Sequence, residues 1–339
     1  MKYVLAIFAL GVLIIVHELG HFIMAKINKV KVIEFSIGMG PKIFTYKGKE
    51  TNYSLSLLPV GGYVQMLGAQ EESEEEGSFT SKSPFRRITI IVAGVVMNFI
   101  LAIVIFTAVL CHFGYQDTSI KEVLQDGPLL EAGLQTGDEV TKVNNSKIIT
   151  FTDLNIEMGK NTGEEVTVEY KRDGEIKEAT IKPKYVDDEG GKRYILGAIF
   201  NVVEDPSLAQ GFKQSFKQSG TLITQTLKTL GKLVTGQGNL KTDIGGPVTV
   251  VQLSAGAAEA GMWELANLVG VLSISLAVFN FLPFPILDGG WTVLLLIELI
   301  TKRKVPEKIV NAMNTVGIVL LVALMVVVTI KDIIFPSVY

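Results

Sequence analysis

The sequence predicts a polytopic α-helical membrane protein with four transmembrane helices and two β-rich segments between them. Its 339 residues are 48% hydrophobic and 19% charged, and its mean hydropathy is +0.39. This hydropathy is too high for an ordinary soluble protein, while the charge is sufficient for a sizeable part in water. Four apolar stretches reach the roughly 20 residues that a helix needs to cross a bilayer.

The four predicted spans are uncharged over most of their length. They cover residues 3–25, 88–113, 265–287 and 309–330. The first span, after Met1 and Lys2, imitates a signal peptide. No small-x-small cleavage site follows it, so we expect it to stay in the mature chain.

Ionisable side chains interrupt the first span in the order His17-Glu18-Leu19-Gly20-His21. A full charge inside a bilayer costs roughly 2.5–3.5 kcal/mol on insertion scales, so these groups need a compensating partner. Residues i and i+4 lie on one face of a helix, which allows His17 and His21 to bind a single Zn²⁺ ion. Glu18 would then reach the water that the zinc binds. This order therefore predicts a zinc site inside a membrane helix.

A catalytic zinc takes three protein ligands and keeps one open position, so a third ligand is expected from another span. Asp288 is the one full charge in the third apolar stretch, which continues as far as Ile297. Two prolines and two glycines surround it and predict a broken helix whose backbone is exposed around the metal. A helix-breaking turn at the membrane interface is the alternative for Asp288.

Basic residues predict which side of the membrane each connection faces. The connections after the first and third spans are rich in Lys and Arg, so we expect both in the cytoplasm and both termini outside. The Lys and Arg residues of the long insert after the second span are not counted, because long domains are translocated regardless of charge. His21 lies five residues before Lys26, which is about 8 Å inside the cytoplasmic face. Asp288 comes late in an inward-running span, so the two halves of the metal site reach a similar depth.

Residues 30–68 resemble neither a span nor an ordinary soluble loop. Alternating patterns at 42–46 and 53–57, around a turn at 47–49, predict β-hairpins, and 58–63 is expected to interrupt regular structure. Non-helical backbone at membrane depth is tolerated only beside protein or a wet cavity. We interpret the segment as a re-entrant β-loop beside the metal site, with an ordinary cytoplasmic hairpin as the alternative.

Several polar residues carry no predicted chemistry. Cys111, the sole cysteine, lies in an apolar run where an inert thiol is expected, and His112 is expected at the membrane interface. An acidic run is interpreted as a solvated cytoplasmic loop and not as a metal site; it contains Glu71, Glu72, Glu74, Glu75 and Glu76.

Residues 116–200 form the water-exposed insert. Its predicted order of strand, short helix, strand, helix and hairpin indicates a small β-rich module. The stretch GPLLEAGLQTGDEVTKVN, residues 127–144, is similar to the signature of PDZ domains. The resemblance implies that a peptide adds to this domain as a strand and that backbone amides capture its carboxylate. Four residues resemble the carboxylate-binding loop, with a plain edge strand as the alternative: Leu196, Gly197, Ala198 and Ile199.

Two helices are predicted after the insert. Apolar residues recur at three- and four-residue spacing over 207–235, which predicts an amphipathic helix on the outer membrane surface or packed on the spans. Residues 245–262 open with Gly245-Gly246-Pro247 and are rich in Ala, as is typical of a short close-packed helix. The predicted parts are transmembrane helix one (1–29), the re-entrant β-loop (30–68), the acidic loop (69–87), helix two (88–115), the PDZ domain (116–200), juxtamembrane helices (201–262), helix three (263–300) and helix four with the C-terminus (301–339).

The motifs together resemble the site-2 protease family of intramembrane zinc metalloproteases. His-Glu-Leu-Gly-His and the pattern Asn-x-x-Pro-x-Pro-x-Leu-Asp-Gly-Gly at 280–290 match its two motifs, and with a PDZ insert the likeness covers essentially the whole chain. The chain is most similar to bacterial regulator-of-sigma-factor proteases with one PDZ domain. The resemblance implies particular roles: zinc ligands His17, His21 and Asp288, the general base Glu18, and the substrate-holding amide Asn280.

The resemblance also implies a substrate class and a location. Peptide bonds in the transmembrane segments of single-span proteins, such as anti-sigma factors or signal-peptide remnants, would be cut after an earlier cut outside the membrane. The enzyme would lie among the lipids of a bacterial cytoplasmic membrane, with its termini and PDZ domain outside and its active site near the cytoplasmic face. Two departures from the family concern local packing: Gly94-Val95 where Gly-Pro is common, and Trp291 where a polar residue is common.

Other function classes fit less well. A catalytically silent scaffold that holds membrane peptides is the alternative, but such a relative is expected to lose the base or a ligand. A metal transporter needs a polar path, and spans two and four contain no full charge. The net charge of −3 gives no indication of a nucleic-acid partner.

Overall fold

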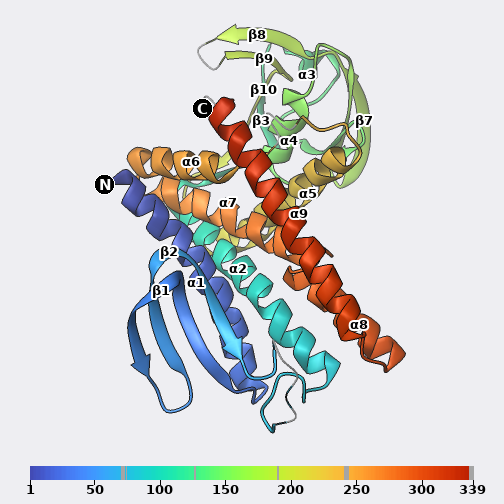
Figure 1. The fold of residues 1–339 in the computed structure, drawn as a ribbon. Helices are drawn as coiled ribbons and strands as arrows, with labels where there is room; N and C mark the ends of the chain where they lie inside the picture. The colour runs from blue at the N-terminus through green and yellow to red at the C-terminus, as the bar shows by residue number, and fades with distance from the viewer. Residues whose placement is uncertain (70–72, 74, 126, 189–190, 240–243, 336–339) are drawn as a thin grey trace. The chain divides into compact units, whose positions relative to one another are not determined.

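The fold of the protein is given by a computed structural model (Figure 1), which describes residues 1–69, 73, 75–125, 127–188, 191–239 and 244–335. The chain divides into two compact units. The membrane unit comprises Met1–Ile105 and Gln225–Tyr339, and the insert unit comprises Phe106–Thr224.

In the described part of the chain, four helices are long and apolar enough to cross a membrane. They are α1 (Lys2–Ile27), α2 (Pro84–Phe113), α7 (Met262–Phe281) and α9 (Glu307–Ile334). Runs of apolar residues form helices in a bilayer because a helix pairs all of its own backbone groups. The four predicted spans are therefore confirmed as helical, and the second begins four residues before the predicted start.

The third apolar stretch contains two helices separated by a break. α7 ends at Phe281, before the predicted Leu287, and α8 (Asp288–Thr301) follows the gap. Pro283 and Pro285 have no N–H to donate, and each disfavours helical backbone in the residue before it. The predicted break is confirmed, and it places Asp288 in the first turn of a new helix.

Small residues and one hydroxyl bring three helices together. A Cβ atom on Gly20 would lie 2.3 Å from the backbone oxygen of Ala93, so only glycine permits this approach of α1 to α2. Small residues at such contacts let helix backbones pack closely in a bilayer. The hydroxyl of Ser273 in α7 donates to the backbone oxygen of Asn98 in α2 over 2.8 Å.

The β-loop forms a sheet of two long, bent strands. β1 (Val32–Lys47) and β2 (Asn52–Met66) pair in several registers, and residues 34–37 pair with both 52–55 and 62–65. Residues 44–47 pair with 52–55 as well. The segment 62–66 is therefore an edge of the sheet among the described strands. Figure 1 shows this sheet beside α1.

The predicted interruption at 58–63 is wrong, because β2 runs through it. Gly61 has a φ of 93°, a conformation that glycine adopts without steric cost. The strand bends there and returns along 34–37, while the predicted hairpin over 42–57 is confirmed. Of the acidic run that follows, Glu75 and Glu76 are exposed. The remaining three members lie outside the described residues.

The insert unit contains a sheet of order β10-β3-β4-β6-β7, with β5 paired to β4. Its strands are β3 (Tyr115–Val123), β4 (Glu139–Val143), β5 (Ser146–Lys147), β6 (Val166–Arg172), β7 (Glu175–Ile181) and β10 (Ala198–Val203). Helices α3 (Pro128–Glu131) and α4 (Phe151–Gly159) lie between strands in the predicted order. A hairpin that the sequence reasoning missed joins β8 (Lys184–Asp188) and β9 (Gly191–Ile195).

A buried ion pair stabilises this sheet. Nε and Nη2 of Arg172 donate to the two carboxylate oxygens of Asp138 at 2.7 Å each, and Asp138 is only 1% exposed. Burial alone would raise the pKa of Asp138, but the hydrogen bonds from Arg172 and from the backbone of Gln135 outweigh it and lower the pKa. The Gly-Asp step of the PDZ-like signature thus has a structural role.

The helix predicted over 207–235 is confirmed as α5 (Leu208–Val234). Its apolar side chains are exposed, with Leu208 at 75% and Phe212 at 51%. The helix buries small and polar residues instead, and Ser215 accepts a hydrogen bond from Thr107 of α2 over 3.1 Å. Leu208 and Phe212 on the apolar side of α5 are therefore largely exposed.

The last predicted short helix is confirmed as α6 (Pro247–Ala260). Its N-terminus is held by Asp332 of α9, whose carboxylate accepts the backbone N–H groups of Gly246 and Thr249 at 3.2 and 2.9 Å. A carboxylate at this position also interacts favourably with the helix dipole.

Candidate metal centre

Three potential ligand atoms converge in the membrane unit, where α1 meets the start of α8. Nε2 of His17 lies 3.2 Å from Nε2 of His21 and 3.2 Å from Oδ2 of Asp288. Nε2 of His21 lies 3.6 Å from the same oxygen. Ligands at about 2.0–2.2 Å from a tetrahedral zinc are about 3.3 Å apart, so the three atoms already have the spacing of three corners of such a site.

The surroundings of Asp288 fit a metal ligand. Oδ2 of Asp288 is buried and has no hydrogen-bond partner, although a buried carboxylate oxygen is costly unless it is paired. Two imidazole nitrogens and one carboxylate oxygen form a set of donors that suits zinc. The residues present therefore fit the predicted metal ion.

Hydrogen bonds orient both histidine rings. Nδ1 of His21 donates to the backbone oxygen of Ile90 over 2.9 Å, which leaves Nε2 unprotonated and directed to the centre. Nδ1 of His17 lies 3.2 Å from the side-chain amide of Asn98. The atom at this distance is Nδ2 of Asn98, while Oδ1 of this fully buried residue has no hydrogen-bond partner. A half-turn of the amide exchanges the two atoms and would let Oδ1 accept the Nδ1 proton of His17.

A glycine of α2 makes room for the rings. A Cβ atom on Gly94 would lie 2.5 Å from Nε2 of His21 and 2.7 Å from Cε1 of His17. Glycine is therefore needed at position 94. The difference from the family at Val95, where proline is common, affects no ligand contact. Trp291, the second departure, is partly buried and packs against an apolar cluster around α2.

The predicted base and the predicted amide both lie beside the centre. The Glu18 carboxylate interacts with His17, His21 and Asp288 and with the backbone of Val64 in the edge segment of the β1–β2 sheet. Its Cγ is 3.4 Å from the position of a Cβ on Gly62 in the same segment. Nδ2 of Asn280 lies 3.4 Å from Nε2 of His17. The structure thus brings together all five residues that the two motifs predict.

Sequence reasoning missed the groups that support the ligands. Asn98 and the carbonyl of Ile90 were not predicted to contact the histidines, although an amide within an uncharged span is itself a signal of function. No sequence signal identifies a particular backbone carbonyl or the glycine that faces the rings, because both depend on how α1 and α2 are packed.

The insert unit has its own groove, separate in sequence from the metal centre. A cavity of about 540 Å³ lies between α4 and the start of β10, and Leu196, Gly197 and Ala198 line it. Gly197 has a φ of 79° and forms the turn into β10. Ile199 does not line this cavity and is 45% exposed, because alternate residues of a strand face opposite sides. The predicted role of this loop concerns its backbone amides and stays a prediction.

Comparisons with known proteins identify the family. The model of peptidase family M50 matches residues 5–324. A protein of Clostridium perfringens is 44% identical over 99% of this chain and 99% of its own length, and one of Clostridium acetobutylicum is 41% identical over 98% and 97%. Both carry the name "putative zinc metalloprotease".

One solved structure is similar to a part of the chain. The PDZ domain of an SdrC-like protein from Listeria monocytogenes is similar to 25% of this chain over 88% of its own length, with a TM-score of 0.22 and 22% identity. The full-length matches, the two sequence motifs and the convergent ligand atoms all indicate the same family. The chain belongs to peptidase family M50, the site-2 protease family, and is a membrane zinc metalloprotease.

Proposed function

We propose that this membrane zinc protease hydrolyses peptide bonds within the transmembrane segments of single-span membrane proteins. The observation that carries the proposal is the position of the metal centre on α1, an apolar helix of 26 residues. A protease whose ligands lie inside such a helix has its reaction site within the span. Its substrates are therefore themselves segments of membrane proteins.

His17, His21 and Asp288 would hold the zinc ion and leave one position open. When bound, zinc polarises a carbonyl oxygen and makes water a stronger nucleophile. Glu18 accepts a proton from the attacking water on its carboxylate and returns it to the leaving amine nitrogen. The amide of Asn280 can both donate to and accept from the backbone of a substrate beside the centre.

The edge of the β1–β2 sheet is suited to hold a substrate in extended form. A helical peptide bond is shielded by its own hydrogen bonds, so the substrate must be extended before water can attack. Residues 62–66 present a strand edge next to Glu18, and a peptide can add to such an edge as a further strand. Exposed apolar side chains on the sheet, such as Phe44 and Leu57 at 63% and 58%, support the interpretation of a re-entrant loop.

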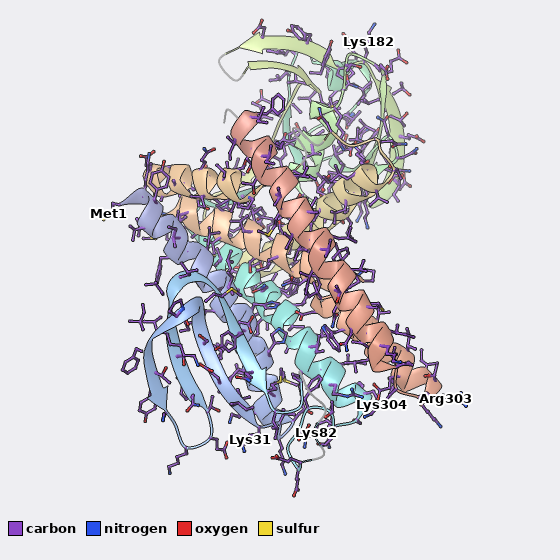
Figure 2. All side chains as sticks on the ribbon, in the orientation of Figure 1. Met1, Lys31, Lys82, Lys182, Arg303 and Lys304 are labelled. Atoms are coloured by element: carbon purple, nitrogen blue, oxygen red, sulfur yellow. The ribbon has the colours of Figure 1, made fainter. Side chains whose placement is uncertain are left out.

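Basic residues support an active site near the cytoplasmic face. In Figure 2, Lys31, Lys82, Arg303 and Lys304 lie at one end of the membrane unit, and Met1 lies at the other. The side rich in Lys and Arg is retained in the cytoplasm. This assignment places both termini outside a bacterial cytoplasmic membrane, with His21 toward the basic end of α1.

The PDZ-like insert would select or gate substrates. The edge of β10 and helix α4 enclose a groove of the kind that accepts an extended peptide. The three ligand atoms come from His17, His21 and Asp288, and no described residue of the insert is among them, so its proposed contribution concerns which substrates reach the site. Anti-sigma factors and signal-peptide remnants are the candidate classes.

The test is cleavage of a single-span model substrate by the full chain in proteoliposomes. Glu18→Gln should abolish cleavage and leave the zinc content unchanged, because the amide cannot accept the proton of water. Asp288→Ala should lose both zinc and cleavage. Cleavage that persists in both variants would contradict the proposal, and a wild-type chain that binds the substrate and zinc without cutting would favour the silent scaffold instead.

A further inference from the structure

The turn that leads into Asp288 has a strained backbone. Its central residues are Pro285 and Ile286, and the N–H of Leu287 donates to the backbone oxygen of Phe284 over 3.2 Å. The φ of Ile286 is 78°, and the ring of Pro285 fixes the preceding φ at about −65°, which fits a type II turn. Glycine or asparagine is usual at the second central position of such a turn, and a β-branched side chain is strained there. A backbone of this kind persists only where the surrounding structure holds it.

Two glycines of α8 pack on this turn and on the end of α7. A Cβ atom on Gly290 would overlap the backbone oxygen of Phe284, and one on Gly289 would overlap that of Phe281. The first turn of α8 therefore lies directly on the carbonyl groups of the break. Gly289 and Gly290 follow Asp288 in the chain, so a shift of the break would move this metal ligand as well.

A glycine of α9 contacts the same turn. A Cβ atom on Gly317 would lie 2.7 Å from Cβ and 3.0 Å from the backbone oxygen of Pro285. Carbon atoms in contact are roughly 3.5–4.0 Å apart, so only glycine lets α9 approach the turn this closely. Gly317 is buried, although the neighbouring Val316 and Ile318 are 56% and 48% exposed. Among these three residues, the contact with the turn is therefore made by the glycine.

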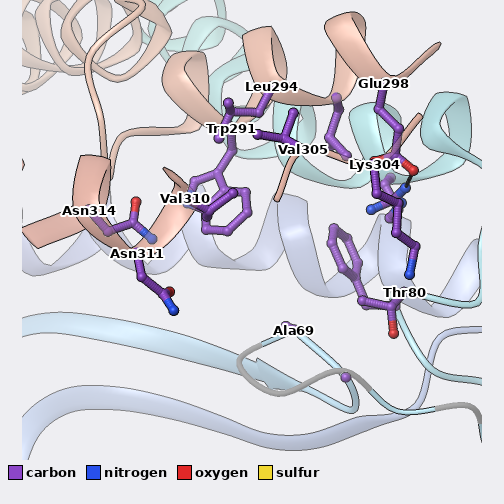
Figure 3. A pocket seen from close by; sticks show the side chains of 14 residues that line it. Ala69, Thr80, Trp291, Leu294, Glu298, Lys304, Val305, Val310, Asn311 and Asn314 are labelled. Atoms are coloured by element: carbon purple, nitrogen blue, oxygen red, sulfur yellow. Dashed lines mark hydrogen bonds and ion pairs between the residues drawn. The ribbon is translucent and has the colours of Figure 1, made fainter. Parts of the chain in front are cut away.

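The rest of α9 gives this contact a fixed support. The first turns of α9 border a cavity of about 670 Å³ beside α8, and Figure 3 shows Asn311 and Asn314 of α9 along this space with Trp291 of α8. Near the other end of the helix, the carboxylate of Asp332 binds two backbone N–H groups at the start of α6. α9 is thus anchored to another helix and meets the turn at Gly317.

We infer that α9, through Gly317, positions Asp288 for the metal ion. The contact of Gly317 with Pro285 keeps the strained turn in its conformation, and the turn keeps the carboxylate of Asp288 close to the two imidazole nitrogens. Gly317 is a positioning residue, because it acts through Pro285 and not on the metal ion. The fourth span therefore contributes to the metal centre, whereas the two sequence motifs lie in the first and third. This role concerns the ligands alone, so it holds whichever peptide bond the enzyme cuts.

Gly317→Ala tests this role in the full chain in detergent. Alanine is the better helix former, so the variant is expected to fold, but its Cβ displaces the turn and Asp288 with it. Transfer of zinc to a chromogenic chelator should be roughly ten-fold faster than in the wild type, as is typical when a group that orients a metal ligand is lost. With Co²⁺ in place of zinc, the visible absorption of the ion should change, because it depends on the number and arrangement of the ligands. Neither readout requires a substrate.

Two further substitutions make the test specific. Gly256→Ala adds the same methyl group to α6, where nothing lies within 4 Å of it, and it should leave both readouts unchanged. Ile286→Gly relieves the strain of the turn, so in this background the added effect of Gly317→Ala on zinc transfer should be smaller. Thermal unfolding of each variant shows that the chain is folded under the same conditions.

Three results would overturn the inference. Unchanged zinc transfer and cobalt absorption in Gly317→Ala would limit this glycine to helix packing, even if the Tm fell. An equal acceleration by Gly256→Ala would assign the effect to a general loosening of the membrane unit. An undiminished effect of Gly317→Ala in the Ile286→Gly background would exclude the turn as the connection between α9 and Asp288.

Discussion

At the scale of single residues, the metal centre depends on a glycine that makes room for the ligands as well as on the ligands themselves. His17, His21 and Asp288 supply the ligand atoms, while Gly94 supplies the room in which two imidazole rings turn toward one oxygen. Asn98 and the carbonyl of Ile90 hold those rings by their second nitrogens. Such supporting contacts set the tautomer and orientation of a histidine ligand.

Gly94→Ala tests the requirement for space. Alanine is the better helix former by about 1 kcal/mol, yet its Cβ would lie 2.5 Å from Nε2 of His21. Displacing a catalytic group by 1 Å can cost about 100-fold in rate, so we expect a large loss of cleavage and weaker zinc binding. Zinc content and cleavage by the purified variant measure both effects.

Gly256→Ala is the matched control. Gly256 lies within α6, where an added Cβ meets nothing within 4 Å. The substitution should leave zinc and cleavage unchanged and stabilise the helix by about 0.5–1 kcal/mol. If both glycine variants behaved alike, the close packing of Gly94 against the rings would have no role.

At the scale of elements, carboxylates hold helix ends and strands in place. Asp332 of α9 is 2% exposed and accepts two backbone N–H groups at the start of α6. Asp138 performs the corresponding role in the insert through Arg172. In each case a buried carboxylate is stable because donors surround it, and its removal leaves those donors unpaired.

Asp332→Ala should destabilise the membrane unit. Loss of a helix N-cap typically costs about 0.5–2 kcal/mol, and here the freed N–H groups are away from water. Thermal unfolding in detergent should show a lower Tm for Asp332→Ala. Glu259→Gln is the control, because its exposed ion pair with Lys2 contributes little to stability and its loss should leave the Tm unchanged.

The pair of Asp138 and Arg172 makes the stability of the insert depend on pH. The folded pKa of Asp138 lies below its unfolded value, which is about 3.9. The stabilisation is therefore complete above about pH 5 and is lost as the pH falls below about 4, through the depressed folded pKa. Hydrogen exchange in the sheet, compared between wild type and Asp138→Asn at each pH, should differ at pH 6 and converge at low pH. A constant difference would contradict this assignment.

At the scale of the whole molecule, the insert is a module whose two ends meet. Tyr115 at the start of β3 pairs with Val203 at the end of β10, so the chain leaves the sheet close to where it enters. Replacement of residues 115–203 by a short Gly-Ser linker is therefore compatible with the helices on either side. The metal ligands all lie outside the replaced segment.

This replacement tests whether the insert is needed for peptide-bond cleavage or for the choice among substrates. The shortened chain should retain zinc and cut a simple transmembrane substrate, while its preference among competing substrates changes. Competition between two single-span substrates in proteoliposomes measures that preference. Complete loss of zinc would contradict the modular arrangement, and an unchanged preference would remove the proposed role of the insert as a selector.

The sequence by itself determined much of this protein. Long apolar runs identified the four spans, since a helix pairs its backbone groups within a single segment. The spacing of His17 and His21 identified half of a metal site from helix geometry alone. Two prolines located the break before Asp288, because proline acts on its immediate neighbours and needs no distant contact.

Only the tertiary structure decided the features that depend on distant contacts. The strand through 58–63 bends at Gly61 because 34–37 offers it a partner, which no local pattern contains. The contact of Asn98 with His17 requires α1 and α2 to be packed at one particular register. The convergence of His17, His21 and Asp288 likewise depends on the break and the packing together. Local patterns therefore identified the ligands, and long-range packing set the distances that make them one site.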